Sequence, residues 1–240
     1  MPETNAHGQP VGHPVPDWMP RPAPESVVLQ GRFVTLTPLS ADDADWIVAE
    51  LTPHPSLWTY RPDDPPTTVD EARRWIADRI ALPQTMTYAV RPRRDDRNLG
   101  MCSLMRTDAA NGVTEIGAII FAPDLQRTPA STEATHLIAR HVFDELGYRR
   151  LEWKCDSLNE PSRRAATRLG FSYEGRFRNH LVVRGRNRDT DWFAMTAQDW
   201  ETIRAAHEQW LDPANFDAEG QQRLPLLAES RAQCDDRGYV

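Results

Sequence analysis

The sequence is poor in cysteine, and its few cysteines form no metal-binding pattern. Three occur among 240 residues, they lie far apart, and none belongs to a Cys-x-x-Cys pair. Widely spaced cysteines in odd number are typical of reduced thiols and argue against a disulfide framework or a zinc site. We therefore expect no metal in this protein and free thiols at Cys102, Cys155 and Cys234.

Long apolar runs are also missing. No stretch approaches the roughly 20 apolar residues that a membrane-spanning helix needs. The first residues lack the basic and apolar regions of a secretory signal peptide. Together with the reduced cysteines, these absences predict a cytoplasmic protein with no membrane partner.

Lysine is nearly absent, since Lys154 is the only one and arginine supplies the other cations. Acidic residues outnumber basic ones, 35 against 28, which gives a formal net charge of -7. A general nucleic-acid binder needs a basic face that neutralises phosphates. The charge balance therefore predicts that nucleic acid is not a partner.

Proline, in contrast, is in excess. The chain has 20 prolines, whereas average usage of about 5% predicts about twelve in this length. Seven of them precede Glu25, so the excess marks a flexible segment rather than a proline-rich fold. We expect a disordered proline-rich tail over residues 1–26, one domain over residues 27–200, and a C-terminal helical and polar extension over residues 201–240.

The hydrophobic pattern of the middle of the chain predicts a mixed sheet. Apolar residues first alternate, as in strands, and later repeat at helical spacing between strands. A β-meander followed by strand-helix-strand-helix order implies a sheet covered by helices. The run Ile119-Ile120-Phe121 is continuously apolar, which is typical of a strand covered on both faces. Strands are expected at residues 27–39, 86–90, 99–106, 113–121, 151–156, 172–183 and 189–195, and helices at residues 129–146, 160–169 and 198–210, with two more that begin after Ser40 and Thr68.

Two helix starts in this pattern hold polar groups that suit ligand binding. At the first, Thr128 is expected to cap the helix and Pro129 to be its first residue. The backbone N–H groups of Ala130, Ser131 and Thr132 then point beyond the helix end, where an anion binds readily. The alternative is an ordinary capped helix, since every helix start has such unpaired groups.

The second helix start is Asn159-Glu160-Pro161-Ser162. Asn159 is a favourable N-cap, and Ser162 lies in the first turn. The helix closes on Gly170, which suits a C-terminal cap. Taken alone, this segment is explained by capping.

Three stretches of the chain are informative because of their order and spacing. They are Glu115-Ile116-Gly117 leading to Pro123, Gln126 through Thr132-Glu133-Ala134, and Asn159-x-x-Ser162 followed by Leu169-Gly170-Phe171. Together they resemble the GNAT superfamily of acetyl-CoA-dependent N-acetyltransferases, most of all its RimJ/RimL branch, which is named for acetylation of ribosomal-protein N-termini. The resemblance covers residues 27–200. It implies an α/β (mixed α+β) fold with a GNAT-like central sheet, mixed but mostly antiparallel, flanked by helices.

The resemblance also implies acetyl-CoA as co-substrate, with one departure at the phosphate loop. That loop is usually Gln/Arg-x-x-Gly-x-Gly/Ala in the family, whereas Pro129 and Ser131 stand at the glycine positions here. Proline offers no N–H, so one phosphate hydrogen bond of about 1.5–3 kcal/mol should be missing. Arg127, Thr128 and Ser131 are candidates to compensate. The residues implied to bind the co-substrate are Ile119, Phe121, Gln126, Arg127, Thr128, Ala130, Ser131, Thr132 and Asn159.

The mechanism that the resemblance implies is direct attack of an amine on the thioester, without an acyl-enzyme. A backbone N–H near the end of the strand at residues 113–121 should stabilise the charge on the thioester oxygen. Ser162 is the candidate proton donor to the leaving thiolate, with first-turn capping as the alternative. Glu115 is the best candidate base, acting through a water. Glu152 and Asp156 are alternative bases, or simply solvated strand residues.

The acceptor is expected to be a primary amine, and most of all an α-amino group. With a pKa of about 7.8, an α-amino group costs about 1 kcal/mol to deprotonate at pH 7, whereas a lysine side chain costs about 4.6 kcal/mol. One alternative is detoxification of an amino-bearing antibiotic or aminoacyl conjugate, in an enclosed aromatic pocket. Another, suggested by Pro129, is a degenerate binding or regulatory module without catalysis. A homodimer is one open alternative for the assembly.

Overall fold

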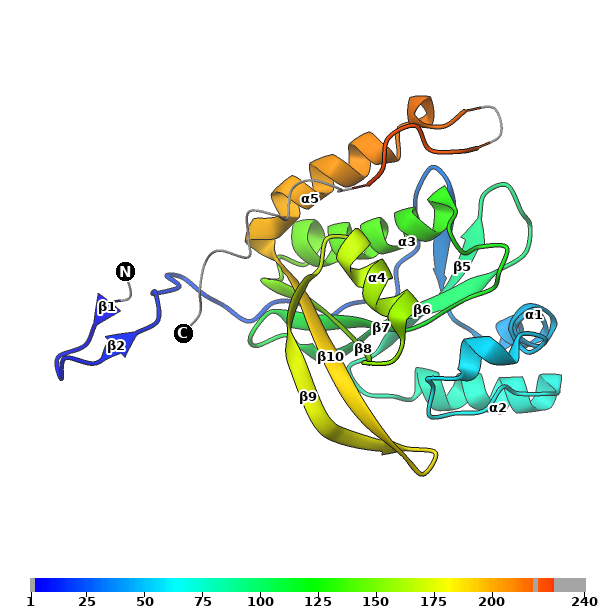
Figure 1. Cartoon of the computed structure of the whole chain (residues 1–240), viewed down its shortest axis with the longest axis horizontal. Helices are drawn as coiled ribbons and strands as arrows, with labels where there is room; N and C mark the ends of the chain where they lie inside the picture. The colour runs from blue at the N-terminus through cyan, green and yellow to red at the C-terminus, as the bar shows by residue number, and fades with distance from the viewer. Residues whose placement is uncertain (1–2, 218–219, 227–240) are drawn as a thin grey trace.

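The computed structural model describes residues 3–217 and 220–226. Eight strands form one sheet in the order β3-β4-β5-β6-β7-β8-β10-β9, and helices pack against it (Figure 1). Neighbouring strands of this sheet are antiparallel except for the parallel pair β7 and β8. The mixed, mostly antiparallel sheet that the sequence predicts is therefore confirmed. Its strands are β3 (Leu29–Gln30), β4 (Val34–Pro38), β5 (Met86–Pro92), β6 (Gly100–Asp108), β7 (Val113–Phe121), β8 (Arg150–Asp156), β9 (Ser172–Val183) and β10 (Arg186–Thr196).

The helices begin at residues whose side chains suit an N-cap. Thr68, Thr128 and Thr196 each accept a hydrogen bond from the backbone N–H three residues later. The helix predicted at residues 129–146 is regular to Arg140 and ends in a wider turn. The helices and helical turns are η1 (Ala41–Asp43), α1 (Ala44–Trp46), η2 (Ile47–Leu51), η3 (Pro55–Trp58), α2 (Val69–Ile80), α3 (Pro129–Arg140), η4 (His141–Glu145), α4 (Glu160–Arg168), α5 (Ala197–Trp210) and η5 (Pro213–Asn215).

Strands β7 and β8 pair over a short length and then separate. The pairs recorded between them end at Glu115 and Glu152, although β7 continues to Phe121 and β8 to Asp156. We call the opening between residues 116–121 of β7 and residues 153–156 of β8 the fork. A β-bulge lies beside it, because the register between β6 and β7 shifts and Ala118 has a φ of 50°. Bulges re-aim backbone groups and are frequent next to active sites.

A buried carboxylate ties α3 to the first strands of the sheet. Glu133 accepts hydrogen bonds from the backbone N–H groups of Arg32, Phe33 and Val34, at 2.8, 2.6 and 2.9 Å. A side chain at Gly31 would meet the same carboxylate at 2.3 Å. The glutamate in the Thr132-Glu133-Ala134 stretch therefore positions α3 against the first strands.

The two ends of the chain contact the domain in different ways. At the N-terminal end, the Trp18 indole donates to the Ala110 carbonyl at 2.9 Å, and the Tyr148 hydroxyl donates to the Pro22 carbonyl at 2.9 Å. At the C-terminal end, α5 packs beside α3 (Figure 1) and crosses the predicted boundary at residue 200. The domain boundaries remain predictions, and residues 227–240 of the predicted extension lie outside the described residues.

Two further findings concern the cysteine thiols and the length of the helices. Cys102 and Cys155 are buried and free, whereas Cys234 lies outside the described residues. No helix in the part of the chain that the structure describes is long and apolar enough to cross a membrane.

Candidate functional site

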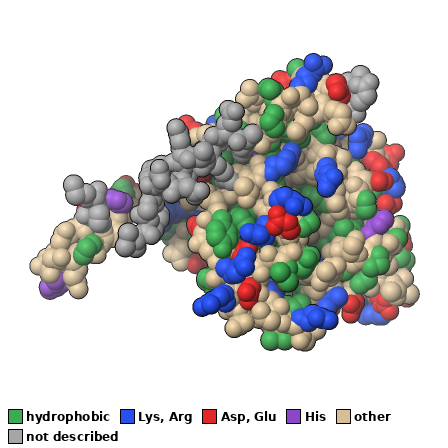
Figure 2. Space-filling model, in the orientation of Figure 1, with side chains coloured by type: hydrophobic (Ala, Val, Ile, Leu, Met, Phe, Trp, Pro, Cys, Tyr) green, Lys and Arg blue, Asp and Glu red, His purple; other side chains and the backbone are tan. Residues whose placement is uncertain are grey.

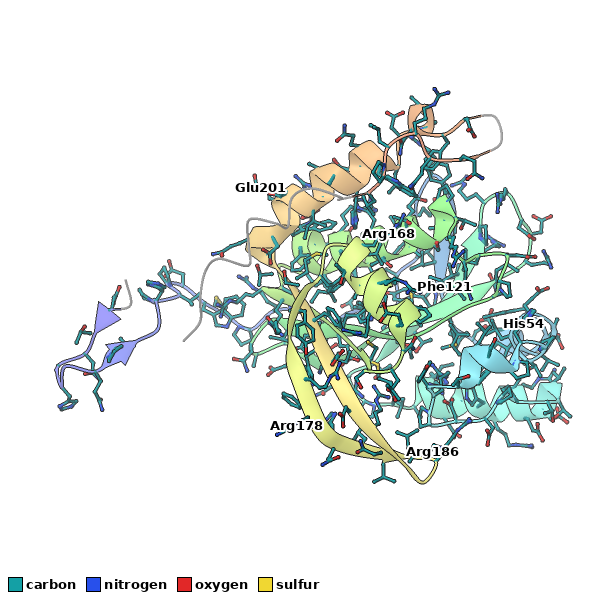
Figure 3. All side chains as sticks on the ribbon, in the orientation of Figure 1. His54, Phe121, Arg168, Arg178, Arg186 and Glu201 are labelled. Atoms are coloured by element: carbon teal, nitrogen blue, oxygen red, sulfur yellow. The ribbon has the colours of Figure 1, made fainter. Side chains whose placement is uncertain are left out.

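A groove of about 1380 Å³ opens at the fork. The end of β7, the first turn of α3 and one side of α4 line it, and Figure 3 labels Phe121 and Arg168 on its walls. Three predicted site residues, Glu115, Thr128 and Ala130, are not among those that line it. The predicted site residues that do line it are Ile119, Phe121, Gln126, Arg127, Ser131, Thr132, Asn159 and Ser162.

The apolar end of β7 forms one wall of the groove. Ile120 is 3% exposed, but Ile119 and Phe121 are only partly buried. The prediction that both faces of this strand end are covered is therefore wrong. The physical reason is that β8 diverges after Glu152, which leaves this edge of β7 without a neighbouring strand.

The start of α3 is the one that the sequence predicts, with Thr128 as N-cap and Pro129 as first residue. The Thr128 hydroxyl accepts from the Ser131 N–H at 3.2 Å and donates to the Leu125 carbonyl at 2.7 Å. The Ser131 hydroxyl donates to the Thr128 carbonyl at 2.8 Å. Both hydroxyls are thus used inside the turn, which weakens them as substitutes for the N–H that Pro129 lacks.

Two other groups at this helix start suit an anion. Arg127 lines the groove, is exposed, and holds a left-handed backbone conformation with a φ of 58°. Among the described residues it forms no ion pair with a carboxylate. Ala130 occupies the second helical position, where the backbone N–H has no acceptor within the helix. A phosphate here would meet this N–H, the helix dipole and one guanidinium.

Ser162 lies in the first turn of α4, but its hydroxyl does not cap the helix. Asn159 is the N-cap, and its side-chain oxygen accepts from the Ser162 backbone N–H at 3.2 Å. The Ser162 hydroxyl oxygen instead accepts from the Trp153 indole N–H at 3.0 Å. Because an indole only donates, this contact fixes the oxygen and does not use the hydroxyl hydrogen, which is directed to the Cys155 sulfur.

The thiol of Cys155 lies beside the same hydroxyl. Burial raises the pKa of Cys155 to about 11, and the hydrogen bond from Ser162 opposes this rise only in part. The thiol therefore stays protonated at neutral pH, in which form it is a poor nucleophile. Cys155 lies on β8 and is 5% exposed.

Two of the candidate bases, Glu115 and Glu152, flank the single lysine. Glu115 is 3% exposed, and one of its oxygens lies 2.8 Å from an Arg106 nitrogen and 3.1 Å from Lys154 Nζ. Lys154 Nζ also lies 2.8 Å from Glu152 and 3.8 Å from the centre of the Trp192 ring. This Glu115 oxygen would have to lose its contacts with Arg106 and Lys154 before it could accept a proton.

The two alternative bases have partners of their own. Burial acts to raise the pKa of Glu152, but hydrogen bonds and charges from Lys154 and Arg150 outweigh it, so the net pKa is lowered. Glu152 is therefore ion-paired rather than merely solvated. Asp156 accepts from the backbone N–H of Leu158 at 2.9 Å and shapes the turn before α4.

Sequence reasoning missed the wall of the groove that is built from the end of α5 and the segment after it. We call this the C-terminal wall: Trp210, Phe216, Gly220, Gln221 and Gln222. Arg168, at the end of α4, connects it to α3, because its guanidinium donates to the Thr132 hydroxyl at 3.0 Å and lies 4.9 Å from the Trp210 ring centre. Figure 2 shows basic side chains on the same face, around α4. No local pattern signals a contact between segments this far apart in sequence.

Among the described residues, no group of three or more His, Cys, Asp or Glu side chains is placed to hold a metal ion.

Known proteins resemble the chain over most of this structure. A family model of the acetyltransferase (GNAT) domain matches residues 34–172. YdaF of Bacillus subtilis, whose name gives it as a candidate ribosomal N-acetyltransferase, is 30% identical over 143 residues, which span 60% of this chain and 72% of that protein. An uncharacterized N-acetyltransferase of Bacillus licheniformis, p20, is 26% identical over 70% of this chain and 94% of its own length. The crystal structure of a GCN5-related N-acetyltransferase from Brucella melitensis matches with a TM-score of 0.85 and 43% identity, covering 88% of this chain and 97% of that one.

Proposed function

The chain belongs to the GNAT acetyltransferase family and is an acyltransferase, and from this premise we propose that it transfers acetyl from acetyl-CoA to the α-amino group of its acceptor. The observation that carries the proposal is one groove that joins the fork, the start of α3 and the Ser162 hydroxyl. In the proposed function they serve as an apolar slot, an anion site and a proton donor, three features that suit an acyl-CoA donor.

The donor would lie along the groove with its thioester at the fork. Ile119 and Phe121 offer apolar contacts for the pantetheine arm. The pyrophosphate would meet the start of α3. The proposed partners there are the Arg127 guanidinium, which lines the groove, and the Ala130 N–H, which has no acceptor within the helix although Ala130 is not among the lining residues. Gln126 supports this wall, since its amide donates to the Phe121 carbonyl at 2.8 Å and holds the chain where it leaves β7.

The chemical step is attack of the amine nitrogen on the thioester carbonyl carbon. The carbonyl oxygen gains charge as the new C–N bond forms, and the backbone N–H of Ile119, beside the bulge at Ala118, is the proposed donor to it. The C–S bond then breaks and the sulfur leaves with the electron pair. Ser162 is proposed to hydrogen-bond to this thiolate and to relay to it a proton that the hydroxyl regains from solvent water. The demand is modest because a thiol of pKa about 8.5 is a fair leaving group as its thiolate.

The amine must also lose a proton, and this requirement favours an α-amino acceptor. Glu115 is the proposed proton acceptor through a water, but Arg106 and Lys154 already engage its oxygen. Such a carboxylate can assist an amine that is partly neutral at pH 7, as an α-amino group is, better than a lysine side chain whose deprotonation costs about 4.6 kcal/mol. The name of YdaF, a ribosomal N-acetyltransferase candidate, supports the same acceptor class.

The proposal is tested by acetyl-CoA-dependent thiol release across a panel of amines. The panel contains ribosomal N-terminal peptides, their α-acetylated counterparts, polyamines, aminoglycosides and aminoacyl nucleotides. We expect release with the free peptides and none with the blocked ones. Release only with aminoglycosides or aminoacyl nucleotides would assign detoxification instead, and calorimetry that finds no acetyl-CoA binding at millimolar ligand would contradict the enzyme altogether.

A further inference from the structure

Lys154 stands out among the basic residues of this chain. Lysine and arginine together number 28, and Lys154 is the only lysine. Its side chain is 12% exposed and lies on β8 beside the fork. An ammonium is a compact point charge, whereas a guanidinium is a planar fork of donors, so the two are not interchangeable. A lysine at this position, in a chain that otherwise uses arginine, points to a role that needs a compact charge.

The Lys154 ammonium lies between two carboxylates and an aromatic ring. Its Nζ atom is 2.8 Å from Glu152 Oε2 and 3.1 Å from Glu115 Oε2. The centre of the Trp192 ring is 3.8 Å from the same atom. Glu115 and Glu152 are partners in the parallel pairing of β7 and β8, in the last pair recorded before the fork. One ammonium therefore holds together two carboxylates that would repel each other without it.

The two oxygens of Glu115 have different surroundings. In the described part of the chain, the ion pairs of this carboxylate use Oε2, which Arg106 contacts as well as Lys154. The other oxygen, Oε1, lies over Gly117 in the fork, where an added Cβ would be 2.9 Å from it. A side chain at residue 117 would push against this oxygen, and glycine leaves room for it. Oε2 is thus anchored, while Oε1 lies at the fork.

We propose that Lys154 is a positioning residue that holds Glu115 by Oε2, so that Oε1 accepts the proton of the acceptor amine through a water. The inference rests on the proposed function, in which Glu115 is the base and the thioester lies at the fork. Arg106 is the weaker anchor, because its side chain is 58% exposed and water competes for its charge.

The ammonium also keeps Glu115 available as a base. Without it, Glu115 and Glu152 face each other, and like charges favour the uptake of a proton by one of the pair. A protonated Glu115 cannot accept the proton of the amine. The other charged or titratable groups around Lys154 are Arg106 on β6, Arg150 and Asp156 on β8, Glu174 and His180 on β9, and Arg188 on β10.

The rate of transfer to an α-amino peptide, measured from pH 6 to 8.5, tests the inference. Lys154→Met should lower kcat/KM about tenfold at pH 6 but only about threefold at pH 8.5, because uptake of the extra proton follows the pH. The Kd for acetyl-CoA should stay within twofold. Lys154→Arg keeps the charge, so any deficit it shows should be the same at every pH. Adding Glu152→Gln to Lys154→Met removes the facing carboxylate and should abolish the pH dependence of the deficit.

A second measurement uses the single lysine directly. Protein labelled with ¹³C at lysine Cε gives one NMR signal, which comes from Lys154. Glu115→Gln and Glu152→Gln should each move this signal, since both carboxylates contact the ammonium. Arg73→Gln breaks an exposed ion pair with Asp70 on α2. It is the matched control and should change neither the signal nor the rate.

The outcomes separate the two proposals. A deficit of Lys154→Met that is equal at every pH, or one that Glu152→Gln leaves unrelieved, would overturn the positioning role and leave the acetyltransferase proposal standing. So would a pH-dependent deficit in Lys154→Arg, or a lysine signal that neither glutamate variant moves, and these two readouts decide the matter even if Lys154→Met is unstable. Absence of transfer by the unmodified protein to every amine of the panel would contradict the proposed function and this inference with it.

Discussion

The indole N–H of Trp153 donates a hydrogen bond to the hydroxyl oxygen of Ser162, with the two atoms 3.0 Å apart. Trp153 extends from β8 at the fork, where it is 6% exposed and packs against the Phe171 ring with centroids 5.5 Å apart. The strand thereby fixes a hydroxyl on α4 where the proposed function places the leaving thiolate. The Ser162 hydroxyl does not cap the helix, and this contact holds it in place for the proposed donor role.

Replacement of Ser162 tests its role as the proton donor. Ser162→Ala should lower kcat about tenfold to a hundredfold, near the lower end of what general acid catalysis contributes, because the thiolate is a fair leaving group. The Kd for acetyl-CoA should change little. Stopped-flow thiol release and calorimetry measure the two quantities. An unchanged rate of release would show that the acid assignment is wrong.

The Trp153 contact provides a control for that variant. Trp153→Phe keeps most of the ring and removes the donor, so its loss of kcat should be smaller than that of Ser162→Ala. If the indole acts by positioning the hydroxyl, the double variant should be no slower than Ser162→Ala alone. Additive losses would mean that Trp153 acts independently of Ser162.

Glu115 should matter most where the amine is protonated. Glu115→Gln should lower kcat/KM for an α-amino peptide about tenfold or more at pH 7, and the deficit should shrink as the pH rises past the amine pKa of about 7.8. Glu174→Gln is the matched control, since Glu174 pairs with Arg150 at an exposed site. A deficit that is independent of pH would assign Glu115 to structure alone.

Two buried histidines should make stability depend on pH. Burial lowers the pKa of His136 to about 4 and that of His207 to about 3, and their rings lie 5.6 Å apart. Below pH about 6.5 the unfolded chain binds protons that the folded chain does not, so the free energy of unfolding should fall by a few kcal/mol between pH 6.5 and 4.

Urea unfolding at pH 7.5, 6 and 5 measures this dependence before most carboxylates titrate. His207→Leu removes one of the two groups, together with its contact to the Leu169 carbonyl at 3.2 Å. This variant should be less stable at pH 7.5 but show a shallower fall toward pH 5. An identical pH slope in the variant would contradict the assignment.

Glu133 is predicted to stabilise the fold and to take no part in chemistry. Glu133→Gln replaces a carboxylate that accepts three backbone N–H bonds, so the free energy of unfolding should drop by about 2–3 kcal/mol. The kcat of the folded variant should stay within twofold. A large loss of kcat with unchanged urea stability would place Glu133 in the site instead.

Local signals predicted much of the site. Thr128 and Asn159 are capping residues whose effect lies within one turn, so the sequence places both helix starts correctly. The long-range contacts had no such signal. Trp153 meets Ser162, and Arg168 meets Trp210, only because β8, α4 and α5 pack together in the folded chain.

The end of β7 shows how a pattern can mislead. A continuous apolar run is typical of a buried strand, and Ile120 is buried as expected. Ile119 and Phe121 are apolar for another reason, since they line the groove opened by the divergence of β8. Sequence alone does not distinguish an apolar wall from an apolar core, because both are built from the same apolar side chains.

The most direct test of the central claim uses one peptide that carries a single free α-amino group and a single internal lysine. The peptide is incubated with acetyl-CoA and the protein, and tandem mass spectrometry locates the added acetyl group. The proposed function predicts acetylation at the α-amino group, with Ser162→Ala slowing it. Acetylation of the lysine, or no transfer to any α-amino peptide of the ribosomal panel, would contradict the account.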